Sequence, residues 1–443
     1  MFTTDIINRT LNETGIAFAF KPAVVGKSVI DSRIAEKNDL FFAFAGEKVD
    51  GHSFIPELLK KGVFCIGSEK FTDKNYCQVP DVRLFMAKLA SIFRTISGKL
   101  IIGVTGSSGK TTTREFIAAM LKISGFEVYS TAGNLNNDIG LPLTLLNTPP
   151  TSTHIVLEMG MNHSGEIKYL ADIATPDFGV ITNIGFAHIG NFESRDGVAA
   201  AKLELFDCNT TYPIANIDDS FVMKWVLNNK ERKVITYSFS GEKANFKVIS
   251  RKYGKLSAQW HNRFYSWELP LMPDYMEENF LTAAAVSLSL GANPDKLSDS
   301  LKNLSIPKFR GEVIKIGNRV IKSDCYNANP DSMMKSIEGF LKIYSNELEP
   351  KTLVLGQMAE LGSFSDYFHI ELVNFLKNVK NVQAIILVGE LYKEALKNVK
   401  NIEYIKWVDD APKAVDFIPE NGYVLLKGSR SARLERIIDN LTH

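Results

Sequence analysis

The sequence predicts an α/β fold divided into three domains. Short apolar runs alternate with segments of helical spacing along most of the 443 residues, a pattern typical of parallel sheets covered by helices. A chain of this length exceeds what one hydrophobic core usually holds. A glycine-rich loop follows the apolar run 101–104 and opens a helix, which indicates a phosphate-binding loop near the start of the middle domain.

Composition excludes several classes of protein. Hydrophobic residues make up 45% of the chain and charged residues 23%, as in soluble globular proteins. A net charge of +1 favours neither nucleic acid nor an anionic membrane as a partner. The first residues form no signal pattern and no apolar run could span a bilayer. We therefore expect no nucleic-acid partner, no membrane insertion and a cytoplasmic location.

The cysteines predict neither a zinc ribbon nor a disulfide scaffold. They stand apart in the sequence, with no Cys-x-x-Cys pair, at Cys65, Cys77, Cys208 and Cys325. Closely spaced pairs are what zinc ribbons use, and dense cysteine spacing marks disulfide-stabilised domains.

The first predicted domain covers residues 1–97. The apolar run 39–46 and the run 63–66 predict two buried strands, and the residues 54–61 between them have helical spacing. Apolar residues at helical spacing over 82–96 predict the helix that closes this domain.

The phosphate loop opens the second domain, 98–308. Backbone N–H groups at the start of a helix bind phosphate oxygens. Lys110 can reach the β- and γ-phosphates, and the Thr111 hydroxyl can bind Mg²⁺. Val104 stands where the usual P-loop has glycine, and the glycine spacing does not fit a dinucleotide fingerprint. The alternative is an ordinary strand–turn–helix corner.

Two further strands of this domain end in polar residues. The apolar run 155–157 ends in Glu158, and the run 178–182 leads to His188. Because ligands bind beyond the carboxyl ends of parallel strands, both side chains are expected on the same rim as the phosphate loop. A carboxylate suits Mg²⁺, whereas a lone histidine is more often a polar loop residue.

A lysine occupies an unusual place in the predicted helix 197–207. The residues at helical spacing from Lys202 are apolar: Val198, Ala199, Leu205 and Phe206. Either Lys202 reaches inward, where burial would lower its pKa, or its stem passes the small alanines to the surface. The sequence leaves both open.

Alternating residues over 246–269 predict antiparallel strands, an alanine-rich helix follows at 277–290, and residues 307–312 predict a linker. The third domain, 309–443, is a second α/β domain of ordinary size. Its predicted strands are 320–324, 352–355, 384–388 and 423–426.

Several long segments resemble the Mur ligases, which build the peptide stem of peptidoglycan. The loop 104–113 has their Thr-Gly-x-x-Gly-Lys-Thr form, in which Val104 is normal. The other similar segments are 31–33, 41–46, 50–52, 131–143, 158–166, 324–332, 355–362 and 427–430. The resemblance covers nearly the whole chain. It implies a small N-terminal α/β UDP-sugar domain, a central P-loop ATPase-like domain with a mostly parallel sheet, and a C-terminal Rossmann-like α/β domain.

The segments resemble most the family member that adds D-alanyl-D-alanine to UDP-N-acetylmuramoyl-tripeptide. The resemblance implies ATP and two Mg²⁺ ions, an acyl-phosphate intermediate, closure of the domains and a monomer. Alternatives are a sister ligase that adds one amino acid, a folate polyglutamate ligase, and a P-loop switch, although the Asn-Lys-x-Asp of GTPases is absent. The third residue of the tripeptide, lysine or diaminopimelate, stays open.

The resemblance also implies roles for individual residues. Catalysis would use Lys110, Glu158, His188 and Lys202, with CO₂ bound to Lys202 as a carbamate. The metal would bind Thr111, Glu158, His188 and Lys202. ATP would bind Thr105, Gly106, Ser107, Ser108, Gly109, Lys110, Thr111, Thr112, Asn279, Arg310 and Asp324. Substrates would bind Ser32, Arg33, Gly46, Asn327, Asn329 and Arg430.

At three positions near these sites the sequence departs from the residues that the family usually has, so the resemblance implies less about the contacts there. Tyr275 and Met276 stand where the family usually has His-Asn, and Gln357 stands where it usually has Asp. Taken alone, the tripeptide 31–33 predicts an Asx turn.

Overall fold

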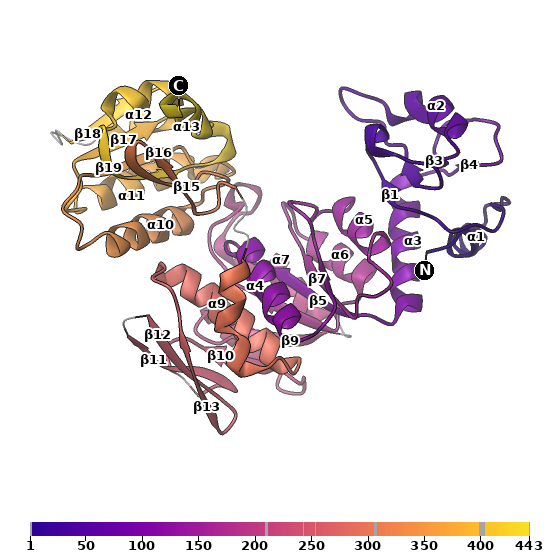
Figure 1. The fold of residues 1–443 in the computed structure, drawn as a ribbon, viewed down its shortest axis with the longest axis horizontal. Helices are drawn as coiled ribbons and strands as arrows, with labels where there is room; N and C mark the ends of the chain where they lie inside the picture. Colours follow the sequence, from indigo (N-terminus) through magenta and orange to yellow (C-terminus); the bar gives the residue numbers. More distant parts are fainter. Residues whose placement is uncertain are drawn as a thin grey trace. The chain divides into compact units, whose positions relative to one another are not determined.

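A computed structural model describes residues 2–208, 211–241, 243–252, 254–304, 308–397 and 404–442. The chain divides into two compact units (Figure 1). Unit 1 contains residues 1–105, 120–180 and 203–214, and unit 2 contains residues 106–119, 181–202 and 215–443. None of the helices in the described ranges combines the length and the apolarity that crossing a bilayer requires.

Unit 1 begins with a small parallel sheet of strand order β1-β2-β3-β4. Its elements are α1 (Thr4–Glu13), β1 (Ser28–Val29), β2 (Leu40–Phe42), α2 (Ile55–Lys60), β3 (Phe64–Gly67) and β4 (Tyr76–Gln78). Buried Phe41, Leu58 and Cys65 belong to one core cluster that joins this sheet to α2. The strands predicted at 39–46 and 63–66 are confirmed. The strands β1 and β4 were not predicted, because strands of two or three residues are too short to show a hydrophobic periodicity.

The other sheet of unit 1 has the strand order β9-β8-β5-β7-β6, and its pairs β5–β7, β6–β7 and β8–β9 are parallel. The strands are β5 (Leu100–Thr105), β6 (Val128–Ser130), β7 (His154–Glu158), β8 (Phe178–Ile181) and β9 (Tyr212–Asn216). The helices are α3 (Val82–Ser97), α5 (Gly140–Leu146) and α6 (Glu166–Ala174), and α3 contacts both α5 and α6. The strands predicted after the phosphate loop are confirmed.

Two helices run from unit 2 into unit 1, namely α4 (Lys110–Ile123) and α7 (Arg195–Asp207). Unit 2 continues with α8 (Ser220–Asn228), β10 (Ile235–Ser238), β11 (Phe246–Lys252), β12 (Lys255–Trp260), β13 (Arg263–Glu268) and α9 (Asp274–Ser289). The strands β11, β12 and β13 are antiparallel, as predicted for 246–269. The predicted helix 277–290 begins earlier, after Pro273 in extended conformation.

The carboxyl-terminal part of unit 2 is a sheet of order β14-β15-β19-β16-β17-β18, parallel except for β14. Its elements are β14 (Glu312–Ile316), β15 (Asn318–Asp324), α10 (Pro330–Ile343), β16 (Lys351–Gly356), α11 (Ser365–Leu376), β17 (Ala384–Val388), α12 (Leu391–Lys397), β18 (Ile405–Val408), β19 (Asn421–Lys427) and α13 (Glu435–Thr442). In Figure 1, α10 lies on one side of this sheet and α13 on the other.

The four strands predicted for the third domain are confirmed as β15, β16, β17 and β19. Of the predicted linker 307–312, Pro307 lies outside the described residues and Glu312 begins β14. Short 3-10 segments complete the chain: η1 (Ser32–Ile34), η2 (Gly51–Phe54), η3 (Ile189–Asn191), η4 (Pro294–Lys296), η5 (Ser298–Asn303), η6 (Gly362–Phe364), η7 (Ala411–Phe417) and η8 (Arg430–Ala432).

Candidate active site

The phosphate loop has the conformation that its sequence predicts. Strand β5 ends at Thr105, and α4 begins at Lys110. Gly109 has a φ of +78°, in the left-handed region that glycine adopts without strain. The ammonium group of Lys110 donates a hydrogen bond to the carbonyl of Gly106 at 2.8 Å. Lys110 is thereby folded back over the loop, where a phosphate oxygen would be its natural partner.

Residues at the end of β8 hold the loop in place. The Ser107 N–H donates to the Asn183 carbonyl at 3.0 Å, and the Ser108 N–H donates to Asn183 Oδ1 at 3.0 Å. The Thr182 hydroxyl donates to the Ser108 carbonyl at 2.6 Å. A Cβ at Gly106 would overlap the Thr182 hydroxyl. The loop therefore has little freedom, which favours pre-organised binding of an anion.

Asn279 on α9 packs against the phosphate loop. A Cβ at Gly109 would overlap Asn279 Oδ1. The Thr113 hydroxyl donates to the same oxygen at 3.4 Å. The structure thus brings together the loop and Asn279, two parts of the predicted ATP site that lie far apart in the sequence.

Lys202 is buried, with 1% of its surface exposed. The inward orientation, one of the two that the sequence left open, is the one observed. Burial lowers the pKa of the Lys202 ammonium well below its ordinary value, and the positive charge of Lys110 lowers it further. The neutral amine is therefore favoured. The Glu204 carboxylate, two residues further along α7, has other partners. It accepts hydrogen bonds from the N–H groups of Gly165 and Lys168.

Glu158 ends β7 in unit 1 and is 2% exposed. Its Oε1 accepts a hydrogen bond from Asn136 Nδ2 at 2.9 Å, and its N–H donates to the Thr131 hydroxyl at 3.0 Å. A buried carboxylate needs a cation or hydrogen-bond donors. Sequence reasoning did not single out Thr131 or Asn136, although both lie in the segment 131–143.

His188 in unit 2 has a left-handed backbone, with φ of +61°. Its Nδ1 lies 2.9 Å from Oε2 of Glu360. The close contact with His188 is the main cause that lowers the pKa of the Glu360 carboxyl. With Nδ1 turned to a carboxylate, Nε2 is the ring nitrogen that can bind a metal. Glu360 was not predicted as a site residue, but it lies in the segment 355–362.

Asp324, at the end of β15, belongs to a buried polar cluster. Its Oδ2 lies 3.0 Å from Lys427 Nζ and accepts a hydrogen bond from the Ser336 hydroxyl at 2.9 Å. Lys427 is 4% exposed and also donates to the Asn327 carbonyl at 3.0 Å. The carboxylate of Asp324 is thus held rigidly by partners within the third domain.

Asn329 joins the third domain to the phosphate loop within unit 2. It caps α10 by accepting a hydrogen bond from the Ser332 N–H, while its Nδ2 donates to the Ser107 carbonyl at 3.4 Å. Nearby, Oδ2 of Asp331 accepts a hydrogen bond from the Phe186 N–H at 2.9 Å. The start of α10 therefore touches both the loop and the segment after β8.

Two predicted arginines have other partners. Arg310 stacks over the ring of Tyr326 at 3.8 Å. Arg430 lies 3.2 Å from Glu435 and over the ring of Phe309. The structure therefore holds both guanidinium groups near residues of the third domain.

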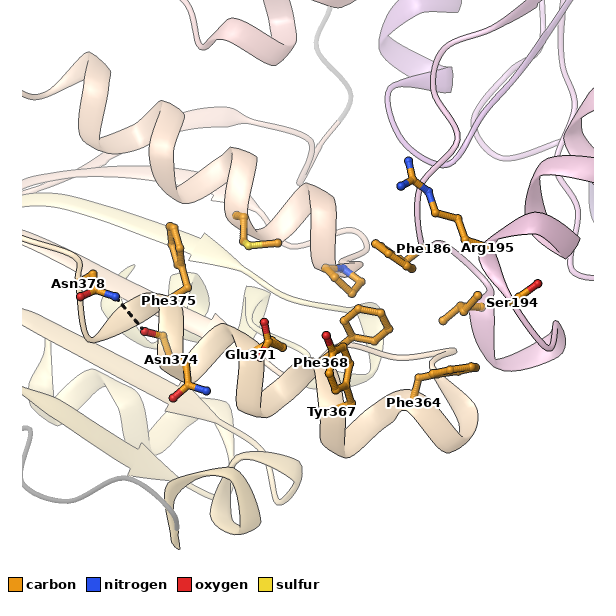
Figure 2. A pocket seen from close by; sticks show the side chains of 13 residues that line it. Phe186, Ser194, Arg195, Phe364, Tyr367, Phe368, Glu371, Asn374, Phe375 and Asn378 are labelled. Atoms are coloured by element: carbon orange, nitrogen blue, oxygen red, sulfur yellow. Dashed lines mark hydrogen bonds between the residues drawn. The ribbon is translucent and has the colours of Figure 1, made fainter. Parts of the chain in front are cut away.

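A pocket of about 630 Å³ lies next to Phe186 and the start of α10, between the segment 186–195 and helices α10 and α11. Figure 2 shows Phe186 and Phe368 facing each other there, with ring centroids 4.8 Å apart. Arg195 stacks over Phe186 and donates to the Ile184 carbonyl. Most of the lining residues are apolar and five of them are aromatic, so the pocket favours apolar groups.

The predicted substrate residues of the first domain lie in unit 1. Asp31 accepts a hydrogen bond from the Arg33 N–H at 3.0 Å, which confirms the Asx turn and places Ser32 at the start of η1. The Arg33 side chain bonds to Asp31 and lowers the pKa of that carboxyl to about 2. The Gly46 N–H donates to the Val49 carbonyl at 3.1 Å.

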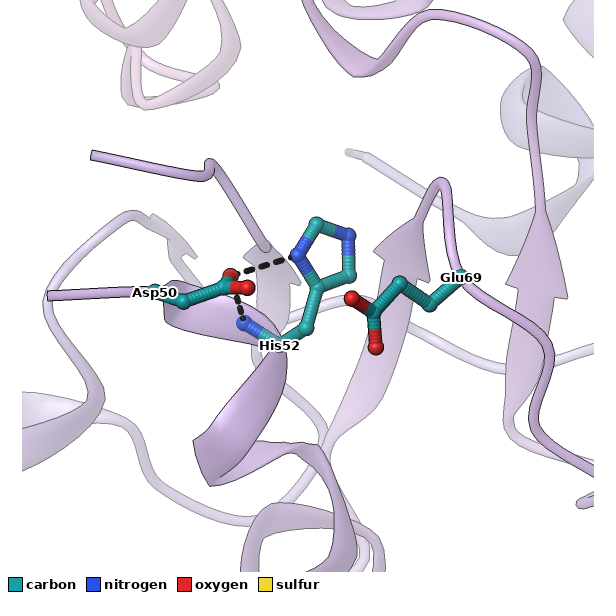
Figure 3. Close-up of side chains that lie close together, drawn as sticks. All are labelled: Asp50, His52 and Glu69. Carbon is teal, nitrogen blue, oxygen red and sulfur yellow. Dashed lines mark hydrogen bonds and ion pairs between the residues drawn. The ribbon is translucent and has the colours of Figure 1, made fainter. Parts of the chain in front are cut away.

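Asp50, His52 and Glu69 lie close together in unit 1, as Figure 3 shows, with ligand atoms within 4.8 Å of one another. Both ring nitrogens of His52 are already used, however. Nδ1 lies 2.7 Å from Asp50 Oδ1, and Nε2 accepts a hydrogen bond from the Ser68 N–H at 2.9 Å. This histidine therefore stabilises the turn rather than binding a metal.

Comparison with known proteins covers nearly the whole chain. Residues 28–94 match the family model "Mur ligase family, catalytic domain", residues 104–287 match "Mur ligase middle domain", and residues 309–430 match "Mur ligase, glutamate ligase domain". The UDP-N-acetylmuramoyl-tripeptide–D-alanyl-D-alanine ligase of Buchnera aphidicola is 31% identical, over 100% of this chain and 98% of that protein.

Solved structures give the same result. MurF from Acinetobacter baumannii superposes with a TM-score of 0.85 at 27% identity, over 100% of this chain and 98% of the other. MurF ligase from Thermotoga maritima in complex with ADP superposes with a TM-score of 0.81 at 27% identity, over 94% and 97% of the two chains.

Proposed function

This chain belongs to the Mur ligase family, and we propose that it joins D-alanyl-D-alanine to UDP-N-acetylmuramoyl-tripeptide in an ATP-dependent reaction of peptidoglycan precursor synthesis. The observation that carries the proposal is the length of the match. The relative named for this activity aligns with the entire chain, so the likeness includes all three domains and not the phosphate loop alone. The predicted α/β fold class agrees with the MurF structures.

ATP is the expected nucleotide. The loop from Thr105 to Thr112 offers backbone N–H groups to the phosphates, and Lys110 offers a positive charge. Support comes from the similar MurF structure with ADP and from Asn279, which packs on Gly109. Arg310 and Asp324 are proposed to contact the nucleotide from the third domain.

Magnesium is proposed to bind Thr111, Glu158, His188 and a carbamate on Lys202. The donor set fits, because hydroxyl and carboxylate oxygens suit Mg²⁺ and His188 turns Nδ1 to a carboxylate. Lys202 fits the carbamate, because burial lowers the pKa of its ammonium and so favours the neutral amine that reacts with CO₂. The amine nitrogen would bond to the carbon of CO₂ and lose one proton, giving an anionic carbamate. When bound, Mg²⁺ would neutralise phosphate charge.

The chemistry follows from the need to activate a carboxylate. Lys110 and the loop orient the γ-phosphate so that an oxygen of the tripeptide carboxylate attacks phosphorus and ADP leaves. The amine of D-alanyl-D-alanine then attacks the carbonyl carbon of the acyl phosphate, and phosphate leaves with formation of the peptide bond. Water must be excluded meanwhile, for which we propose domain closure.

The remaining proposals concern substrates and organisation. Ser32, Arg33 and Gly46 are proposed to bind the UDP-sugar, and Asn327, Asn329 and Arg430 the peptide end. The functional domains are proposed as 1–97, 98–308 and 309–443, in a monomer of the cytoplasm. The Arg33 side chain is largely exposed to solvent, although its guanidinium also bonds to Asp31.

One assay tests the activity. Purified protein with ATP, Mg²⁺ and the muramoyl tripeptide is offered D-alanyl-D-alanine or single amino acids, and phosphate release is measured. Release that requires both the tripeptide and D-alanyl-D-alanine supports the proposal. Preference for a single amino acid would favour a sister ligase, and ATP turnover that needs neither substrate would favour a P-loop switch. Tripeptides with lysine and with diaminopimelate determine the third residue.

A further inference from the structure

Glu360 places its carboxylate against the ring of His188 within unit 2. Its Oε2 lies 2.9 Å from Nδ1 of His188. The two residues are far apart in the sequence, one in the loop after β8 and the other in the loop after β16. Both have left-handed backbones, with φ of +61° and +63°, a conformation that costs free energy for residues other than glycine.

The two loops interlock through their backbones as well. The Gly190 N–H donates to the Glu360 carbonyl at 3.0 Å. A Cβ at Gly190 would overlap the Gly362 N–H, and a Cβ at Gly362 would come within 2.7 Å of Gly190 Cα. Two glycines are thus needed for the loops to approach this closely. The close approach brings the Glu360 carboxylate to the imidazole.

Aromatic and polar contacts support the same junction. Phe186, in the loop of His188, packs on Phe368 of α11. Its N–H donates to Asp331 at the start of α10. Three residues of the third domain, Asp331, Glu360 and Phe368, therefore contact the loop after β8, and Glu360 is the one that reaches the histidine (Figure 2 shows the neighbouring aromatic pair).

We propose that Glu360 is a positioning residue for the metal site: its carboxylate pairs with Nδ1 of His188 at 2.9 Å and thereby presents Nε2 to the metal ion. This inference rests on the proposed function, in which His188 is a metal ligand. A carboxylate on the far nitrogen of a metal-binding histidine fixes its tautomer and ring orientation and makes the ligand more basic.

A functional consequence follows from where Glu360 lies. Because it belongs to the third domain, the histidine is fully oriented only when the third-domain loop is docked on the loop after β8. Metal binding and docking of the third domain then favour each other, since each stabilises the same arrangement. The ligase would thereby delay phosphoryl transfer until the third domain is in place.

The test measures metal binding without turnover. Mn²⁺ is titrated into the full-length protein saturated with the β,γ-imido analogue of ATP, and the Mn²⁺ bound beyond the ion carried by the nucleotide is measured by electron paramagnetic resonance. We expect Glu360→Ala to weaken this binding by about 10- to 100-fold and Glu360→Gln, which keeps an acceptor oxygen, to weaken it less. Glu338→Ala, which removes an exposed carboxylate of α10, is the matched control and should bind as wild type.

A double-mutant cycle separates positioning from other roles. If Glu360 acts through His188, Glu360→Ala should have no further effect in the His188→Ala background. Losses that add would overturn the proposal, as would an unchanged affinity in Glu360→Ala or the absence of the additional Mn²⁺ in wild type. Thermal melts of each variant identify unfolded protein, and Glu360→Gln then serves as the variant that keeps the fold. If wild type makes no product from D-alanyl-D-alanine but the cycle holds, only the proposed substrate is wrong.

Discussion

Gly109 of the phosphate loop and Asn279 of α9 are in such close contact that no side chain fits between them. A Cβ at position 109 would overlap Asn279 Oδ1, and the φ of +78° at Gly109 is itself unfavourable for other residues. The hydroxyl of Thr113, one turn into α4, reaches the same oxygen. Asn279 therefore packs directly against the phosphate loop and limits its movement, in addition to the contact with the nucleotide that is proposed for it.

Gly109→Ala is expected to lower the affinity for ATP by at least about tenfold, because a left-handed alanine costs about 1–2 kcal/mol and the overlap moves either the loop or Asn279. Binding of the imido analogue of ATP, measured by calorimetry, checks this. Gly125→Ala is the matched control. Gly125 also has a positive φ, +95°, but nothing lies within 4 Å of its Cβ position. Equal affinities in the two variants would show that the contact with Asn279 is unimportant.

Asp324→Ala is expected to destabilise the protein by about 3–5 kcal/mol, because it leaves the buried ammonium of Lys427 without its carboxylate. The free energy of unfolding in urea measures this. Adding Lys427→Met should recover much of the loss, since no uncompensated charge then remains. If the double variant is as unstable as Asp324→Ala, the ion pair at 3.0 Å is not the cause.

The buried ammonium of Lys322 should make the free energy of unfolding depend on pH. Burial lowers the pKa of its ammonium to about 8 from an ordinary 10.5, although Asp324 opposes the shift. The unfolded chain binds this proton more tightly, so the lysine lowers stability below pH 8, and the penalty disappears as pH rises towards 10.5. Lys322→Met should therefore stabilise the protein by about 3 kcal/mol at pH 7 and by less than about 1 kcal/mol at pH 10. Urea unfolding at both pH values checks this, with exposed Lys315→Met as the control. A gain that does not change with pH would reflect packing alone.

The sequence was most informative where a pattern is local. The phosphate loop and the strands ending in Glu158 and Asp324 are found as predicted, because periodicity and glycine spacing depend on near neighbours. The orientation of Lys202 stayed open, since helical spacing shows which neighbours are apolar but not how much protein covers them. Burial in the folded structure decided it.

Glu360 and Asn183 could not be predicted from spacing at all. Their partners, His188 and the backbone of Ser107, come from other parts of the chain. Such contacts depend on how strands are ordered in the sheets, and a single sequence does not specify that order. The roles of the predicted metal and substrate residues stay predictions.

Lys202→Ala is expected to lose at least about 100-fold in phosphate release that depends on both substrates, because it removes the proposed anionic carbamate from the charge that organises phosphoryl transfer. A small carboxylate such as formate or acetate should partly restore activity, since it can occupy the space of the carbamate and supply its oxygens. Lys202→Arg should not be rescued, because a guanidinium stays charged and fills that space. Lys122→Ala, which removes an exposed lysine of α4, should have the activity of wild type and no response to formate. If Lys202→Ala is fully active, or is inactive but unaffected by every small carboxylate while still folded, the amine itself and not a carbamate accounts for this lysine.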